Sequence, residues 1–181
     1  RAHEEDDTLT AEILLENLAC KATGTMALRT LLEDKSLDST TVDYVLDCGE
    51  EAVGERYQRG GGNLAKAIAE ACGLINATGS DVKAFCCGPN HAIAVGSSLV
   101  YSGLFERVLV VGGCSLAKLG MKYQGHLKND MPIIEDVLAG AAILLEKQDG
   151  EGPIVRLDSV GTHPIGAGGS QAKILEELVS K

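Results

Sequence analysis

The stretch VKAFCCGPNHAIAVGSSLVYSGLFERVLVVGG, residues 82–113, decides the fold of this chain. It opens with a short apolar run, residues 82–85, which predicts a buried strand. Residues 90–104 predict a helix, because their apolar side chains recur at three- and four-residue spacings: Ala92, Val95, Leu99 and Leu104. A second apolar run, residues 108–111, predicts another strand and ends in two glycines. Strand, turn, helix and strand make a βαβ unit, so we expect an α/β protein.

The turn between this first strand and the helix carries two adjacent cysteines, Cys86 and Cys87, followed by Gly88 and Pro89. Open α/β sheets bind ligands at the carboxyl ends of their strands, so we expect the functional site at this turn. A helix N-terminus offers unpaired N–H groups and the positive end of the helix dipole, which favour a thiolate by roughly 0.3–1 kcal/mol. A nucleophilic cysteine here would therefore still need a base or a cation nearby.

Composition restricts the class of protein. The 181 residues suit one domain, residues 1–181, and combine 45% hydrophobic residues and 22 Gly with no Trp. A net charge of −10 argues against a nucleic-acid surface. The sequence has no CxxC motif, no signal peptide and no apolar stretch of eighteen residues, so we expect free thiols in a reducing cytoplasm and no membrane span. Since the chain starts at Arg1, it is expected to be a piece of a longer protein.

Further elements follow from the same patterns. Helices are predicted over residues 10–19, 64–72 and 171–179. Another helix is predicted to begin at a cap on Thr23 or Thr25 and to end near Lys35. Strands are predicted over residues 42–46, 140–145 and 154–160. Residues 74–80 and 120–132 are predicted to be irregular, with a short helix leading to Ala139. On the first helix, Ile13, Leu14 and Leu18 share one face, and Cys20, Cys48, Cys72 and Cys114 are expected in the core.

Three glycines, residues 60–62, lie between Arg59 and Asn63 just before the helix over residues 64–72. Glycines let the backbone come close to a ligand or to a neighbouring strand turn, and a flexible helix start explains them equally well. Neither a Walker A loop nor a GxGxxG motif is present there. The spacing of His126 and the other histidines matches no metal motif, so no metal site is predicted.

Two local strings resemble the amino-terminal half of the duplicated fold of the thiolase and β-ketoacyl synthase III superfamily. CCGPNHAI, residues 86–93, resembles its nucleophile motif, with Cys86, Ala92 and Ile93 at the matching positions, and RVLVVGG, residues 107–113, resembles the following strand. DVLAGAAILLE, residues 136–146, is similar to the strand before the two halves join. The resemblance implies a three-layer αβα half-domain with a mixed, mostly parallel five-stranded-type sheet that lacks the first strand.

Residues 50–73, 83–92 and 115–142 resemble, more closely, the beta subunits of component C of the glycine, sarcosine and betaine reductase complex. The resemblance implies acyl transfer, in which component C receives a carboxymethyl group from a selenoprotein, holds acetyl as a cysteine thioester and yields acetyl phosphate. Cys86 holds the nucleophile position, and Cys87 is the alternative. No firmly bound cofactor is implied. The candidate substrates are an acetyl thioester, phosphate, coenzyme A and an acyl carrier.

Several residues around this turn are candidates for binding the oxyanion or the substrate: Gly88, Asn90, His91, Gly112 and Gly113. The loops add Arg59, Asn63 and His126. His91 follows Cys86 by five residues and is expected on another face of the helix, so it is not assumed to be the base. The resemblance implies that the catalytic His, and the Asn or second His, lie in a carboxyl-terminal half that is not part of the given sequence.

The implied partners are the other subunit of component C, the selenoprotein component and a second copy of this chain. In the homodimer, residues 82–85 pair with their twin across a twofold axis, because an exposed apolar edge strand would otherwise aggregate. Two other functions remain open: a condensing enzyme of the ketoacyl synthase III type, and a non-catalytic dimerising scaffold. The choice among glycine, sarcosine and betaine is also open.

Overall fold

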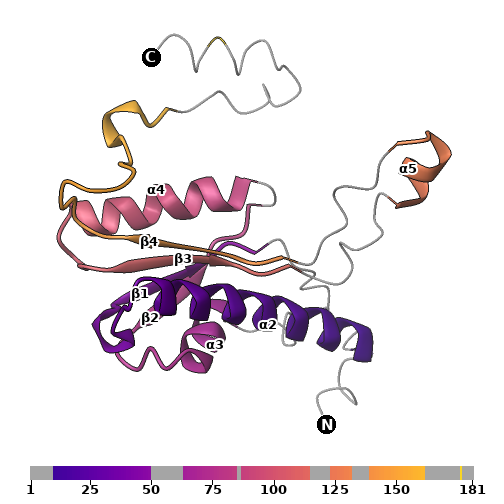
Figure 1. The fold of residues 1–181 in the computed structure, drawn as a ribbon, viewed down its shortest axis with the longest axis horizontal. Coiled ribbons are helices and arrows are strands. Elements are labelled where there is room, and N and C mark those ends of the chain that lie inside the picture. The colour runs from indigo at the N-terminus through magenta and orange to yellow at the C-terminus, as the bar shows by residue number, and fades with distance from the viewer. Residues whose placement is uncertain are drawn as a thin grey trace. The chain divides into compact units, whose positions relative to one another are not determined.

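The computed structural model describes residues 10–49, 63–84, 87–114, 123–131, 139–161 and 176, in two compact units, residues 1–147 and 148–181. The first unit contains a four-stranded sheet with helices on both faces (Figure 1). Its elements, in chain order, are α2 (Ala11–Asp34), η1 (Ser39–Thr41), β1 (Tyr44–Asp47), α3 (Leu64–Ala71), β2 (Thr78–Asp81), α4 (Gly88–Tyr101), β3 (Val108–Gly112), α5 (Tyr123–Lys128) and β4 (Ala141–Leu145). In the second unit, the described residues include one short 3-10 helix, η4 (Leu157–Ser159).

The strand order is β2-β1-β3-β4. Strand β1 pairs in parallel with both β2 and β3, whereas β4 runs antiparallel to β3. The register places Asp47 beside Asp81 on one side and beside Val111 on the other, so the carboxyl ends of the three parallel strands lie at one edge of the sheet. This mixed, mostly parallel sheet confirms the predicted fold class.

Alternating side chains of the strands build two cores. On one face, Leu109 and Val111 of β3 pack with Leu28 of α2 and Ile68 of α3. On the other face, Val108 and Val110 pack with α4, which gives the three αβα layers seen in Figure 1. Because both faces of the central strands are covered, β3 is continuously apolar and β1 is polar only at its ends, Tyr44 and Asp47.

Helix α2 is continuous over 24 residues, so the predicted break at Thr23 is wrong. The Thr23 hydroxyl donates to the carbonyl of Ala19 at 2.9 Å and accepts from the backbone N–H of Cys114 at 2.9 Å, so it bonds inside the helix instead of capping a new one. The predicted apolar face is also wrong, since Leu14 and Leu18 are exposed. The buried face carries Asn17, Cys20, Gly24 and Leu28, a set with small and polar members that masks the helical pattern.

Helix α4 packs on the sheet through small residues. Gly88, Ala92 and Gly96 are buried at four-residue spacings, and a Cβ atom on Gly96 would lie 2.7 Å from Leu145 Cδ1. Of the residues predicted to face the core, Ala92 is buried and Leu99 is partly buried, but Val95 and Leu104 are exposed. Glycine therefore sets this interface, since it lets the helix approach the sheet closely.

Three other predictions differ from the structure. The strand before Cys86 is β2, Thr78–Asp81, and residues 82–84 only continue from it as irregular chain. Residues 154–160 contain η4 instead of a strand, and the irregular segment 120–132 contains α5. The predicted bridging helix before Ala139 and the predicted final helix over residues 171–179 fall outside the described residues, apart from residues 139 and 176.

Candidate functional site

The start of α4 lies beside the carboxyl end of β1. A Cβ atom on Gly88 would lie 2.9 Å from the carbonyl oxygen of Cys48, so only glycine allows this approach. Cys87 occupies the N-cap position with an exposed side chain that makes no capping hydrogen bond. Its backbone N–H donates to the carbonyl of Ala84 at 3.0 Å. The first-turn N–H groups of α4 are therefore not capped by this side chain, and they favour negative charge at the turn.

A cavity of about 380 Å³ adjoins this helix start. Its walls come from the ends of β1 and β3, the start of β4 and the first turn of α4, with the lining residues Cys48, Gly49, Pro89, Val110, Gly112, Gly113, Ala139, Gly140, Ala141 and Ile143. Most of these residues are small or apolar, so the cavity suits an uncharged group. The strand ends and the helix start thus converge on one hollow at the edge where α/β sheets bind ligands.

Close backbone approaches shape the far wall of this cavity. A Cβ atom on Gly113 would overlap the carbonyl of Cys20, and one on Gly140 would overlap the carbonyl of Thr23. Helix α2 therefore rests directly on the backbone that follows β3 and precedes β4. Larger residues at either position would push the helix away from the cavity wall.

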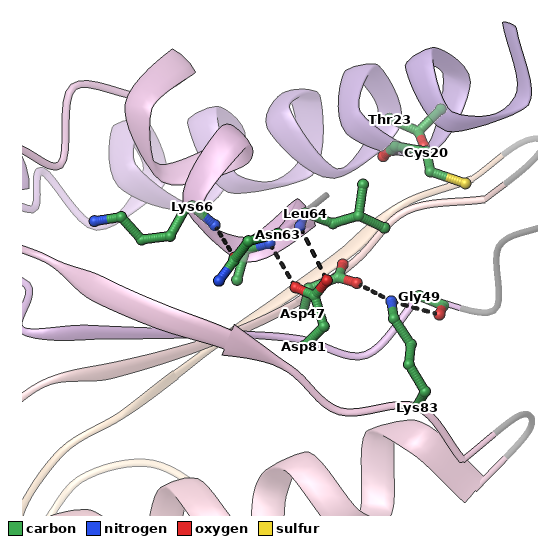
Figure 2. Close-up of polar contacts among 10 residues, drawn as sticks. Cys20, Thr23, Asp47, Gly49, Asn63, Leu64, Lys66, Asp81 and Lys83 are labelled. Atoms are coloured by element: carbon green, nitrogen blue, oxygen red, sulfur yellow. Dashed lines mark hydrogen bonds and ion pairs between the residues drawn. The ribbon is translucent and has the colours of Figure 1, made fainter. Parts of the chain in front are cut away.

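Charged residues lie at the same edge of the sheet (Figure 2). The Asp47 side chain is only 2% exposed, and its Oδ2 pairs with Lys83 Nζ at 2.6 Å. Lys83 Nζ also donates to the carbonyl of Gly49 at 3.4 Å. A buried carboxylate needs such a partner, because an unpaired charge away from water is strongly unfavourable.

The neighbouring carboxylate, Asp81, binds the start of α3. Its two oxygens accept the backbone N–H groups of Leu64, at 3.0 Å, and Ala65, at 2.9 Å. Asn63 caps the same helix, since its Oδ1 accepts from the N–H of Lys66 at 2.7 Å while its Nδ2 donates to the carbonyl of Gly79 at 3.1 Å. These bonds satisfy the helix N–H groups that lack partners within α3.

Eight of the ten predicted site residues fall into three groups. Gly88, Gly112 and Gly113 come together at the cavity and the start of α4. Cys87, Asn90 and His91 are exposed in the first turns of α4. Cys86 and Arg59 lie outside the described residues.

The remaining two candidates, Asn63 and His126, lie on other helices. Asn63 has the capping role described above, so its contact with a ligand remains a prediction. His126 lies on α5, and its buried Nδ1 has no hydrogen-bond partner among the described residues. Its contribution to the site likewise remains a prediction.

The described cysteines lie in different environments. Cys20 and Cys48 are buried, as predicted, whereas Cys72 and Cys114 are only partly buried. Burial raises the pKa of the Cys72 thiol, and the nearby guanidinium of Arg29 opposes that shift. Cys72 therefore stays protonated to higher pH than an ordinary thiol.

Sequence reasoning missed Asp47, Lys83 and Asp81. Each is a charged residue at or beside the end of an apolar or strand-forming segment, a position where an unpaired charge is costly. That pattern was the available signal. Their partners come from chain segments up to 36 residues away, so only the fold reveals the pairing.

Comparison with known proteins relates the chain to two groups. Residues 80–161 match the family model for 3-oxoacyl-[acyl-carrier-protein] synthase III. The glycine/sarcosine/betaine reductase complex component C subunit beta of Peptoclostridium acidaminophilum is 46% identical over 179 residues, which are 99% of this chain and 35% of that protein. The chain thus spans about a third of the length of this curated relative.

Solved structures share the fold. A 3-oxoacyl-(acyl-carrier-protein) synthase III superposes on 75% of this chain and 39% of its own, with a TM-score of 0.56 and 19% identity. The β-ketoacyl-[acyl-carrier-protein] synthase III of Thermus thermophilus covers 73% of this chain and 38% of its own, with a TM-score of 0.54 and 22% identity. These neighbours identify the fold as thiolase-like.

Two kinds of feature are absent from the described part of the chain. No helix there is long and apolar enough to cross a membrane. No cluster of three or more His, Cys, Asp or Glu side chains there is arranged to hold a metal ion.

Proposed function

We propose, from the relationship of this chain to a component C beta subunit, that it is the cysteine-bearing part of such a subunit in a glycine, sarcosine or betaine reductase complex. The observation that carries this proposal is the 46% identity, which extends over 99% of the chain. In this role, the chain holds an acetyl group as a thioester on Cys86. The substrate of the parent complex is set by its other components.

The chemistry of this role is acyl transfer. Phosphate attacks the thioester carbonyl, the carbon–sulfur bond breaks, and the products are acetyl phosphate and the Cys86 thiolate. In the reverse direction, the thiolate attacks acetyl phosphate and releases phosphate. First-turn N–H groups of α4 stabilise the negative charge on the carbonyl oxygen and on the thiolate. Two features support this role: the small-residue cavity beside the helix start, and the position of Cys86 two residues before Gly88.

Intact-mass spectrometry after incubation with acetyl phosphate or acetyl-CoA tests the proposal. We expect a gain of one acetyl group on the wild-type chain and on Cys87→Ser, and no gain on Cys86→Ser, with peptide mapping to locate the adduct. An adduct that disappears only in Cys87→Ser would move the nucleophile by one residue. A folded chain that takes up no acetyl from either donor would refute thioester formation on this chain.

The proposed partners are the second subunit of component C, the selenoprotein component and a second copy of this chain, in a reducing cytoplasm. Strand β2 is the edge of the described sheet and pairs on one side only, with β1. The homodimer contact is therefore assigned to Thr78–Asp81 and not to residues 82–85. This edge is polar, so backbone hydrogen bonds and not apolar burial would hold the two copies.

A condensing enzyme of the ketoacyl synthase III type is the second candidate, because that family model matches residues 80–161. Such an enzyme would join an acyl group on Cys86 to a malonyl group on an acyl carrier, with loss of carbon dioxide. Incubation of the acetylated chain with malonyl-acyl carrier protein separates the two functions. Formation of a β-ketoacyl product would favour the condensing enzyme, and release of acetyl phosphate by phosphate alone would favour component C.

A further inference from the structure

We propose that the ion pair between Asp47 and Lys83 positions the chain on both sides of residues 85–86, and thereby Cys86, so that both are positioning residues for acyl transfer. The inference rests on the proposed function, because it assigns Cys86 the acyl group. The underlying observation is that chain segments on both sides of residues 85–86 are held against residues 47–49, at the end of β1.

The segment before the turn is tied to β1 by three contacts. The backbone N–H of Val82 donates to the carbonyl of Asp47 at 2.7 Å. The Lys83 side chain points toward the end of β1, where its Nζ donates hydrogen bonds to Asp47 Oδ2 at 2.6 Å and to the Gly49 carbonyl at 3.4 Å, as Figure 2 shows. The ammonium group thus bridges the side chain at the end of β1 and the backbone beyond it.

The segment after the turn contacts the same place. Gly88 lies against the carbonyl of Cys48, and the N–H of Cys87 donates to the carbonyl of Ala84 at 3.0 Å. This last bond joins the residues that flank positions 85 and 86. Both flanks are thereby held to a single support, residues 47–49.

The ion pair acts through geometry and not through its field. Its two charges lie 2.6 Å apart and largely cancel at longer range. The adjacent acid, Asp81, lies opposite Asp47 in register, but its carboxylate is bound to the start of α3. Lys83 pairs with Asp47, and Asp81 is held by the helix N–H groups, so the two like charges in neighbouring strands contact different groups.

The two members of the pair differ in exposure, and this difference guides the choice of variants. Asp47→Asn leaves an ammonium whose side chain is 36% exposed and can be hydrated, whereas Lys83→Met removes this ammonium from a carboxylate that is 2% exposed. We expect Lys83→Met to lower the thermal midpoint more than Asp47→Asn. The double variant, Asp47→Asn with Lys83→Met, removes both charges and should recover most of the midpoint lost in Lys83→Met.

The test is the rate of Cys86 acetylation by acetyl phosphate in folded variants, measured by quenched mass spectrometry over a range of acetyl phosphate concentrations. We expect the double variant and Asp47→Asn to lose at least about tenfold in maximal rate with little change in half-saturation, because a misplaced turn impairs the reaction more than binding. Lys83→Arg, which keeps the ion pair, should restore at least about a third of the wild-type rate.

The matched control is the pair between Arg107 and Glu146, whose Nε and Oε2 are 3.1 Å apart at the opposite edge of the sheet. The double variant Arg107→Met with Glu146→Gln removes an ion pair that has no link to the turn, so its acetylation rate should match wild type. A folded Asp47→Asn or double variant that is acetylated at the wild-type rate would overturn the proposal.

Iodoacetamide labelling of Cys86, located by peptide mapping, separates this inference from the proposed function. Its rate depends on the exposure of the thiol and on its position relative to the helix start, and it requires no acetyl transfer. We expect a change of at least about threefold in Asp47→Asn and none in the control pair. If wild type takes up no acetyl, the proposed function fails, and the labelling rates decide the positioning role alone: altered labelling supports it, and unaltered labelling refutes it.

Discussion

The start of α3 yields a quantitative prediction, because two side chains of different charge share its N–H groups. The Asp81 carboxylate accepts from the backbone N–H groups of Leu64 and Ala65, two residues that are 1% and 0% exposed. The Asn63 side chain accepts from the backbone N–H of Lys66, which is an exposed residue. Hydrogen bonds to a charged group contribute about 1.5–3 kcal/mol each. Asp81→Ala removes two such bonds and leaves buried N–H groups without partners, so it should lower the free energy of unfolding by about 3 kcal/mol or more.

Two further variants at the start of α3 provide stability losses against which that of Asp81→Ala can be compared. Asn63→Ala removes one neutral cap and should cost about 1 kcal/mol. Asp81→Asn keeps one acceptor oxygen but loses the charge that complements the helix dipole. Its loss of unfolding free energy should therefore lie between those of Asp81→Ala and Asn63→Ala. Glu70→Ala, an exposed position further along α3, is the control and should change stability by less than about 0.5 kcal/mol.

Urea unfolding followed by far-ultraviolet circular dichroism measures these differences, since the chain contains no Trp to report by fluorescence. The reasoning requires the midpoint to shift with little change in slope, because the same surface is exposed on unfolding. If Asp81→Ala costs no more than Asn63→Ala, the carboxylate does not carry the helix start and the argument fails.

Two other predictions concern Gly88 and Cys72. Gly88→Ala should destabilise the chain by about 1–3 kcal/mol in the same urea assay, because its Cβ would lie 2.9 Å from the Cys48 carbonyl oxygen. The control is Gly125→Ala, because a Cβ on Gly125 would meet no atom of the described residues within 4 Å. Equal stability of the two variants would contradict the close approach at Gly88. Because burial raises the pKa of Cys72 and Arg29 lowers it, alkylation of Cys72 should be slow near neutral pH and rise at higher pH than in a cysteine peptide, and Arg29→Gln should slow it further. A Cys72 alkylation profile that coincides with that of the peptide would refute this environment.

Elements with strong local patterns were predictable. Helix α3 follows three glycines and β3 is a continuous apolar run, and both elements are predicted to within one residue of their observed bounds. Three of the predicted site residues, Gly88, Gly112 and Gly113, come together at the start of α4, and their role in a functional site stays a prediction. For these elements, local propensity and tertiary packing favour the same structure.

Elements whose residues serve tertiary contacts were not predictable. Strand β2 reads Thr-Gly-Ser-Asp, which is typical of a turn. A Cβ on Gly79 would lie 2.5 Å from the Val45 carbonyl oxygen and 3.2 Å from the Cβ of Ala65, so glycine allows the close approach of β1 and α3. The sequence pattern predicts a helix cap at Thr23 or Thr25, but α2 runs through both positions, and the Thr23 hydroxyl bonds within α2 and to Cys114, 91 residues along the chain. In each case, a partner distant in sequence overrides the local signal.

The sequence by itself determined the α/β class, the relationship to a component C beta subunit and the position of the cysteine turn, because these depend on the order of apolar runs and on short contiguous motifs. Only the tertiary structure decided that Asp47 pairs with Lys83 and that Asp81 holds α3. The physical reason is that a buried charge must find its partner in space. Parallel pairing of β1 with β2 supplies these partners by bringing residues 47 and 81–83 to one edge of the sheet.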